Sequence, residues 1–241
     1  MPFYKRISKR TWTVLVIILC TAALIAGICF FLTWLKERRD TARLVQQLQQ
    51  YTADKLSAYA AENEAYDDYE IDVAFLGDSL TDGYPVEQFY PQFKVTNRGI
   101  GGDTTFALFD RLQTSVLDLK PKVLVMLIGA NNLPTMFENY EEILKTFQQQ
   151  LPQTKVVLLS LTSMSGDWSH KNERAAYSNV KIKLLAQKYG YEFVDLFTPL
   201  LDLETGMLKA EYTFDGGHLT HAGYEVVTAA VTPTLERLLS E

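Results

Sequence analysis

The stretch IDVAFLGDSL, residues 71–80, decides the fold that we expect for this chain. Five of its first six residues are apolar, and a Gly-Asp-Ser turn follows them directly. A nearly continuous apolar run is typical of a strand buried on both faces of a parallel sheet, with helices on either side. Such sheets place ligands at the carboxyl ends of their strands, which is where Ser79 falls.

Four further runs of this kind follow along the chain, at 93–97, 122–128, 155–160 and 191–195. Helical patterns alternate with them, at about 104–117, 137–150, 172–189 and 221–239. Strand and helix in alternation predict a three-layer α/β/α domain built on a parallel five-stranded sheet. We place this domain at residues 71–241.

The N-terminal part predicts a single transmembrane helix. Residues 12–35 contain no charged side chain, and 24 helical residues reach roughly 36 Å, enough to cross a hydrocarbon core of about 30 Å. Trp12 and Trp34 lie near its ends, where indole rings prefer the membrane interface. Residues 1–11 form a basic tail before the span, and residues 36–70 form a helical connector after it. A cleaved signal peptide is the alternative.

Charge around the span bears on its orientation. Four basic residues and the chain amine precede it, whereas the basic residues after it are mixed with acids. This bias favours an inside N-terminus and an extracytoplasmic domain. The connector also carries a possible apolar stripe, formed by Leu44, Leu48, Tyr51, Leu56 and Tyr59. A solvated stalk, packing on the domain and self-association all remain open for it.

Composition excludes several classes of function for the domain. Residues 71–241 carry 14 basic and 21 acidic side chains, and this acidic balance argues against nucleic-acid binding. Cys20 and Cys29, the two cysteines of the chain, lie within the apolar span. The domain therefore has no disulfide framework, no thiolate metal site and no cysteine nucleophile.

Ser79 has two potential partners near the other end of the chain, in Asp215-Gly216-Gly217-His218. A serine hydroxyl becomes a good nucleophile when a base takes its proton and a third group holds the base. The spacing of Asp215 and His218 lets the carboxylate reach the imidazole ring. As alternatives, Ser79 could be a simple helix cap, and His218 with His221 could bind a metal, although no further ligand completes that set.

Two more polar loops follow predicted strands. Residues 97–105, NRGIGGDTT, have three glycines in four positions, which lets the backbone approach a ligand closely. Asn131 follows the third strand, where its amide could stabilise a developing oxyanion. Plain turn or cap functions are the alternatives for both loops. Residues 161–171 and 132–139 could supply apolar walls around a site, or simply pack on the domain.

These motifs together resemble the SGNH/GDSL hydrolase superfamily over roughly residues 70–240. The blocks Gly77-Asp78-Ser79-Leu80, Gly102, Gly129-x-Asn131 and Asp215-x-x-His218 occur in the order of that superfamily. One departure is Asn132, where the third block usually ends in aspartate; this residue bears on local support rather than on catalysis.

The resemblance implies a flavodoxin-like fold and a serine esterase that needs no metal or cofactor. It assigns Ser79 as nucleophile, His218 as base and Asp215 as the group that orients the base. It also implies an oxyanion hole made by the backbone N–H groups of Ser79 and Gly102 and by the side chain of Asn131.

The substrate stays open between an O-acetyl group on an envelope polysaccharide and a lipid acyl ester, as a lysophospholipase or thioesterase would cleave. A non-catalytic binding domain on the same fold is the competing hypothesis.

Overall fold

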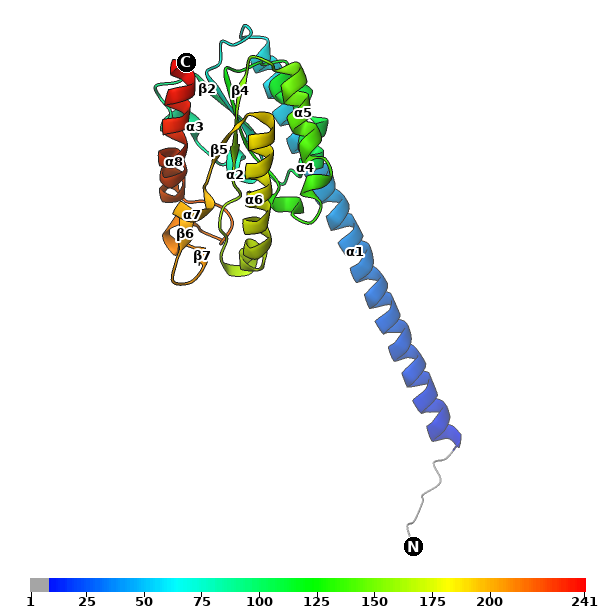
Figure 1. Ribbon diagram of the computed structural model, residues 1–241. Helices are drawn as coiled ribbons and strands as arrows, with labels where there is room; N and C mark the ends of the chain where they lie inside the picture. Colours follow the sequence, from blue (N-terminus) through cyan, green and yellow to red (C-terminus); the bar gives the residue numbers. More distant parts are fainter. Residues whose placement is uncertain (1–8) are drawn as a thin grey trace. The chain divides into compact units, whose positions relative to one another are not determined.

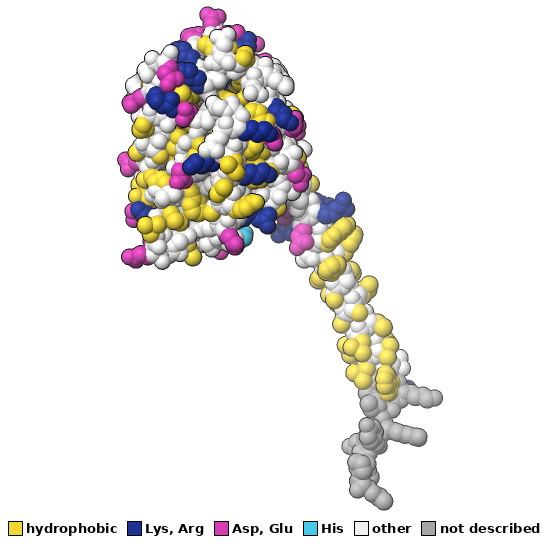
Figure 2. Space-filling model, viewed as in Figure 1, with side chains coloured by type: hydrophobic (Ala, Val, Ile, Leu, Met, Phe, Trp, Pro, Cys, Tyr) yellow, Lys and Arg dark blue, Asp and Glu magenta, His cyan; other side chains and the backbone are white. Residues whose placement is uncertain are grey.

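The computed structural model describes residues 9–241. They divide into two compact units, the first ending at Ala53 and the second spanning Asp54–Glu241. In the first unit the described residues belong to helix α1 (Lys9–Asn63), which continues into the second. Hydrophobic side chains are exposed along its apolar part (Figure 2), where Leu19 and Phe30 are 67% and 75% exposed. Among the described residues, one helix is long and apolar enough to cross a membrane, and a signal sequence would meet the same criterion.

The second unit is built around a sheet of five parallel strands, as predicted. Their order is β2-β1-β3-β4-β5. The strands are β1 (Val73–Gly77), β2 (Val95–Gly99), β3 (Val123–Leu127), β4 (Lys155–Leu159) and β5 (Glu192–Val194). Every residue of β1 and β3 is buried, so the nearly continuous apolar runs do mark central strands covered on both faces.

Helices cover both faces of this sheet. Figure 1 shows α3 and α8 on one side and α4 and α5 on the other, and α6 packs beside α5. The helices of the domain are α2 (Ser79–Asp82), α3 (Val86–Phe89), α4 (Thr105–Asp110), α5 (Tyr140–Gln150), α6 (Asn172–Tyr189), α7 (Phe197–Leu200) and α8 (His221–Ser240). Short 3₁₀ turns span Ala130–Asn132, Met136–Glu138, Gly166–Lys171 and Ala210–Tyr212.

One local prediction needs correction, and one pair of strands was not predicted. The helix expected at 104–117 is split into α4 and a π-helical turn, Gln113–Leu117. The buried guanidinium of Arg111 lies at this break and donates to Ser115 Oγ, 2.8 Å away. The antiparallel pair β6 (Leu201–Asp202) and β7 (Met207–Leu208) was not predicted, because two-residue strands are too short to show a periodicity.

The predicted apolar stripe of the connector divides between the two units. Leu44, Leu48 and Tyr51 are exposed, whereas Tyr59 is only 4% exposed. The second unit begins at Asp54, so the last turns of α1 are part of the compact domain, ahead of the boundary at residue 71. Of the three alternatives for the connector, the structure supports packing on the domain for these last turns of α1.

Candidate active site

Ser79 is the first residue of α2, directly beyond the carboxyl end of β1. Asp78 caps the helix by accepting a hydrogen bond from Leu80 N at 3.1 Å. A Cβ atom on Gly77 would lie 2.2 Å from Leu127 O, so only glycine allows the strand to turn this closely. The first N–H groups of a helix have no partner within the helix, and this leaves the Ser79 N–H at the site for a ligand.

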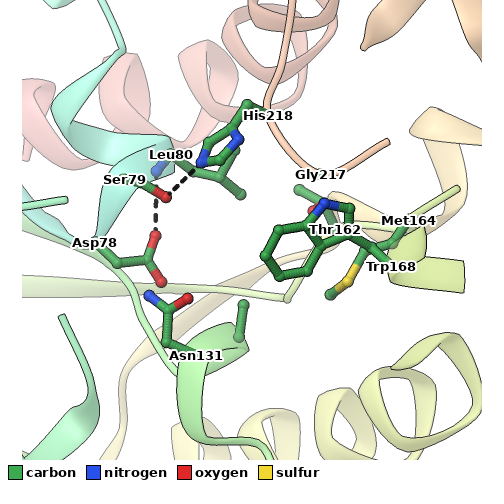
Figure 3. Close-up of a pocket in the computed structure, with 10 residues that line it drawn as sticks. Asp78, Ser79, Leu80, Asn131, Thr162, Met164, Trp168, Gly217 and His218 are labelled. Atoms are coloured by element: carbon green, nitrogen blue, oxygen red, sulfur yellow. Dashed lines mark hydrogen bonds between the residues drawn. The ribbon is translucent and has the colours of Figure 1, made fainter. Parts of the chain in front are cut away.

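The structure brings Ser79, His218 and Asp215 into one hydrogen-bonded row. His218 Nε2 lies 3.0 Å from Ser79 Oγ, and His218 Nδ1 lies 2.6 Å from Asp215 Oδ2 (Figure 3 shows the first of these contacts). The other oxygen of Asp215 accepts the backbone N–H of Gly217 at 2.9 Å and that of His218 at 2.7 Å. One carboxylate therefore fixes both the ring of the histidine and the turn that carries it.

Asp215 is held in its charged form. Partial burial on its own raises the pKa of its carboxyl, but the hydrogen bonds from the His218 ring and from two backbone N–H groups outweigh burial and lower that pKa to about 2. The charged carboxylate therefore accepts a hydrogen bond from Nδ1–H of the ring. In the neutral imidazole this leaves the lone pair of Nε2 directed at the Ser79 hydroxyl.

The turn around His218 depends on a glycine. Gly216 has φ +88°, and a Cβ there would lie 2.3 Å from Ser165 O. Ser165 N donates to Gly216 O at 2.8 Å, while Thr213 Oγ1 donates to His218 O at 2.7 Å. The bond from Ser165 joins the loop of His218 to residues 161–171, and the bond from Thr213 closes the loop itself.

Two loops beside Ser79 carry the other predicted site residues, Gly102 and Asn131. Gly102 has φ +83°, a backbone conformation that favours glycine, and the adjacent Gly101 N donates to Asp82 Oδ2 on α2 at 3.1 Å. Asn131 Nδ2 donates to Asp103 O at 2.8 Å. An amide has two N–H groups, so this bond leaves another for an oxyanion. Figure 3 shows the Asn131 amide pointing toward Asp78 and Ser79.

The departure at Asn132 does not remove local support. Asn132 Oδ1 accepts Thr105 N at 3.2 Å, and its Nδ2 donates to Thr105 Oγ1 at 3.0 Å. Both bonds hold the first residue of α4, which follows the glycine loop. A carboxylate at this position could not make the donating bond.

Arg111 is a functional residue that the sequence analysis missed. Its side chain is 3% exposed and donates to Asp103 Oδ2 at 2.6 Å, to Arg98 O at 3.0 Å and to Gly77 O at 2.9 Å. It therefore ties the ends of β1 and β2 to the loop that carries Gly102. The signal was its place beside the apolar residues Leu108 and Leu112 of the predicted helix, because a charge at such a position needs buried partners.

Ser79 opens into a pocket of about 40 Å³. It is lined by Asp78, Ser79, Leu80, Ala130, Asn131, Thr162, Met164, Trp168, Gly217 and His218 (Figure 3). The segment 161–171 thus supplies apolar walls, through Met164 and Trp168. In the segment 132–139, by contrast, Leu133 and Met136 are buried in the core.

Aromatic rings flank His218 on two sides. The Trp168 ring meets it edge-on, with centroids 6.4 Å apart, and a Cβ on Gly217 would lie 3.1 Å from the indole nitrogen. Phe214 stacks on the imidazole at 5.9 Å and is itself 73% exposed.

The structure does not support a metal site at His218 and His221, because no group of three or more His, Cys, Asp or Glu among the described residues could hold an ion. His221 lies instead near Glu225, with 3.8 Å between Nε2 and Oε1.

Known proteins share this architecture. Residues 75–226 match the GDSL-like Lipase/Acylhydrolase family. A candidate platelet activating factor from Streptococcus pneumonia is 27% identical, with a TM-score of 0.72, and the match covers 80% of this chain and 96% of that one. A GDSL-like lipase from Bacteroides thetaiotaomicron is 25% identical, with a TM-score of 0.67 and coverage of 76% and 97%.

An acetylxylan esterase from Geobacillus stearothermophilus shares the fold at 18% identity, with a TM-score of 0.58 and coverage of 70% and 95%. No curated protein matches the sequence. The family match spans more than half of the chain, and the hydrogen-bonded row at Ser79 lies within it. This chain belongs to the GDSL-like lipase/acylhydrolase family and is a serine ester hydrolase.

Proposed function

We propose that this chain is a membrane-anchored esterase that removes small acyl groups from esters at the outer face of a membrane. In this proposal Ser79 is the nucleophile, His218 the general base and Asp215 the group that orients it. The alignment of the three side chains, at 3.0 and 2.6 Å, is the observation that carries the proposal.

The chemistry follows from these positions. His218 Nε2 takes the Ser79 proton as Oγ attacks the ester carbonyl. The Ser79 N–H, the Gly102 N–H and the Asn131 amide stabilise the oxyanion of the tetrahedral intermediate. His218 then protonates the departing alcohol, which leaves an acyl group on Ser79. Water then attacks the acyl carbon as His218 takes its proton. The bond to Ser79 Oγ breaks, His218 returns the proton to Oγ, and the carboxylic acid leaves.

The size of the pocket supports a short acyl group. A volume of about 40 Å³ is several times the roughly 10–15 Å³ needed to place one water, but far below the roughly 300 Å³ of pockets that enclose drug-sized ligands. Met164 and Trp168 close it on the apolar side. An acetyl group fits this space better than a long acyl chain does.

We further propose that the natural ester is an O-acetyl group on an envelope polysaccharide. Anchoring through residues 12–35 would keep the enzyme beside such an immobile substrate. The acidic balance of residues 71–241 is consistent with a substrate of low negative charge.

An ester panel tests the acyl preference. The full-length protein in detergent is given p-nitrophenyl esters from acetyl to palmitoyl, an O-acetylated polysaccharide and a lysophospholipid, with Ser79→Ala as the blank. We expect kcat/KM to be highest for acetyl or propionyl esters and acetate to be released from the polysaccharide. A preference for long acyl chains or for the lysophospholipid would contradict the proposed substrate and favour the lipid hydrolase.

Membrane anchoring and orientation need a separate test. They rest on the apolar span in α1 and on the basic tail before it. Protease added to intact cells should digest residues 54–241 while the protein fractionates with membranes. Full protection of this unit in intact cells, with digestion after lysis, would contradict the outward orientation, and release of the chain into the medium would indicate a cleaved signal.

A further inference from the structure

The loop that carries Gly102 is held on one side by Arg111 and, at its base, by the end of α1. We propose that Lys55 and Tyr59, in the last turns of α1, are positioning residues for the oxyanion hole. This inference rests on the proposed function of Gly102 as an oxyanion donor. Both residues lie in the second compact unit, together with the loop that they contact.

Lys55 acts through the nucleophile helix. Its Nζ lies 2.6 Å from Asp82 Oδ1, and the side chains of the pair are 30% and 17% exposed. Asp82 is the last residue of α2, which begins at Ser79, and its second oxygen accepts the Gly101 N–H at 3.1 Å. A single carboxylate therefore joins α1, the helix of the nucleophile and the residue before Gly102. Charge-assisted bonds that are partly shielded from water hold their geometry better than exposed pairs do.

Tyr59 holds the start of the loop, at the end of β2. Its hydroxyl donates to Gly99 O at 2.7 Å, and its side chain is buried. The ring covers the guanidinium of Arg98, with 4.7 Å from Cζ to the ring centroid, and Arg98 Nη1 donates to Tyr59 O at 3.2 Å. The Arg98 side chain is fully buried, and its Nη2 lies 3.2 Å from Glu62 Oε2, so the end of α1 supplies the partners that a buried charge requires.

These two contacts hold the residues that directly precede the proposed oxyanion donor. Tyr59 binds the carbonyl of Gly99, and Lys55 fixes the carboxylate that binds the N–H of Gly101. Gly102 follows at φ +83°, and a Cβ built there would have no atom within 4 Å. Because the space on the side-chain side of Gly102 is open and three glycines make the segment pliable, its N–H depends on the residues beside it for its position.

The test separates positioning from folding. In the full-length protein, Lys55→Met removes the ion pair, and Tyr59→Phe removes only the hydroxyl. Lys122→Met and Tyr191→Phe are matched controls. Lys122 pairs with Asp72 at 2.7 Å before the amino ends of β3 and β1, and the Tyr191 hydroxyl donates to Leu144 O at 3.2 Å.

We expect kcat for an acetyl ester to fall about tenfold in Lys55→Met and in Tyr59→Phe. Loss of a whole oxyanion donor costs about 10²–10³, and a displaced donor costs less. KM should change by less than about twofold, because the donor acts mainly in the transition state. Lys55→Arg should retain most of the activity, and the two controls should match the wild type in kcat. Equal values of kcat in the test variants and the controls, at similar Tm, would overturn the proposal.

Hydrogen exchange tests this inference independently of the proposed function. We expect the backbone amides of residues 99–104 to exchange faster in Lys55→Met and Tyr59→Phe than in the wild type or the controls. Unchanged exchange there would contradict the inference even in an active enzyme. A wild-type protein without esterase activity would contradict the proposed function, and the exchange rates would still decide whether α1 holds the loop.

Discussion

Replacing Asp215 by asparagine tests whether this carboxylate sets the proton position on His218. Asp215 Oδ1 accepts two backbone N–H groups, so the amide oxygen of the variant should take that place. The amide NH₂ would then face His218 Nδ1, where the carboxylate oxygen lies at 2.6 Å in the wild type. Nδ1 must accept this N–H, so the ring proton moves to Nε2, and Nε2 can no longer take the Ser79 proton.

The exposure of Asp215 sets the size of the effect. The same change at a buried triad carboxylate costs about 10⁴ in turnover. The Asp215 side chain is 37% exposed, so water can compete for the ring and weaken the preference for one tautomer. We therefore expect kcat to fall about 10²–10³, equivalent to about 3–4 kcal/mol of transition-state stabilisation.

Initial rates with p-nitrophenyl acetate at pH 7 measure this loss in the full-length protein. Asp167→Asn is the control, because Asp167 is an exposed acid on the loop that carries Trp168. Circular dichroism and Tm show whether the variant is folded. A folded Asp215→Asn protein with kcat within threefold of the wild type would refute the assignment of Asp215 as the orienting group.

Three further substitutions have expected outcomes. Asn131→Ala should lower kcat by about 10²–10³ with little change in KM, as measured by steady-state kinetics, and a loss below threefold would remove Asn131 from the oxyanion hole. Trp168→Ala should raise the octanoyl-to-acetyl ratio of kcat/KM by about tenfold or more, because it opens the pocket wall; an unchanged ratio would show that another residue limits chain length. Asp78→Asn should raise Tm more at pH 8 than at pH 5. Burial raises the pKa of Asp78 from 3.8 to about 7, so charging it in the folded state costs stability that grows between pH 4 and 7. Equal shifts in Tm at both pH values would argue against this cost.

The central strands could be predicted because their sequence is almost entirely apolar. A run such as 71–76 fits few elements other than a strand buried on both faces. The carboxyl ends of parallel strands then lie together at one edge of the sheet. This is why Ser79, Asn131 and the glycine loop were expected together. Residues 215–218 follow no central strand. In the structure, the close approach of Gly216 to Ser165 fixes their loop against residues 161–171, beside Ser79.

The supporting residues could not be predicted because their environment is tertiary. Arg111 lies within a helical pattern that does not identify the four acceptors around its guanidinium. Tyr59 and Leu48 belong to the same predicted apolar stripe of the connector. Tyr59 is buried and Leu48 is exposed, and this difference depends on contact with the folded domain. Local patterns report that a residue is apolar or charged, whereas its partners depend on segments far away in the sequence.

Covalent labelling of Ser79 tests the central claim most directly. The full-length protein is treated with a fluorophosphonate probe, and the adduct is counted by intact mass and located by peptide mapping. We predict a single adduct, on Ser79, which blocks hydrolysis of p-nitrophenyl acetate and is lost in Ser79→Ala. A folded wild-type protein that takes up no probe, or a Ser79→Ala variant that is still labelled and still hydrolyses the ester, would contradict the assignment of Ser79 as the nucleophile.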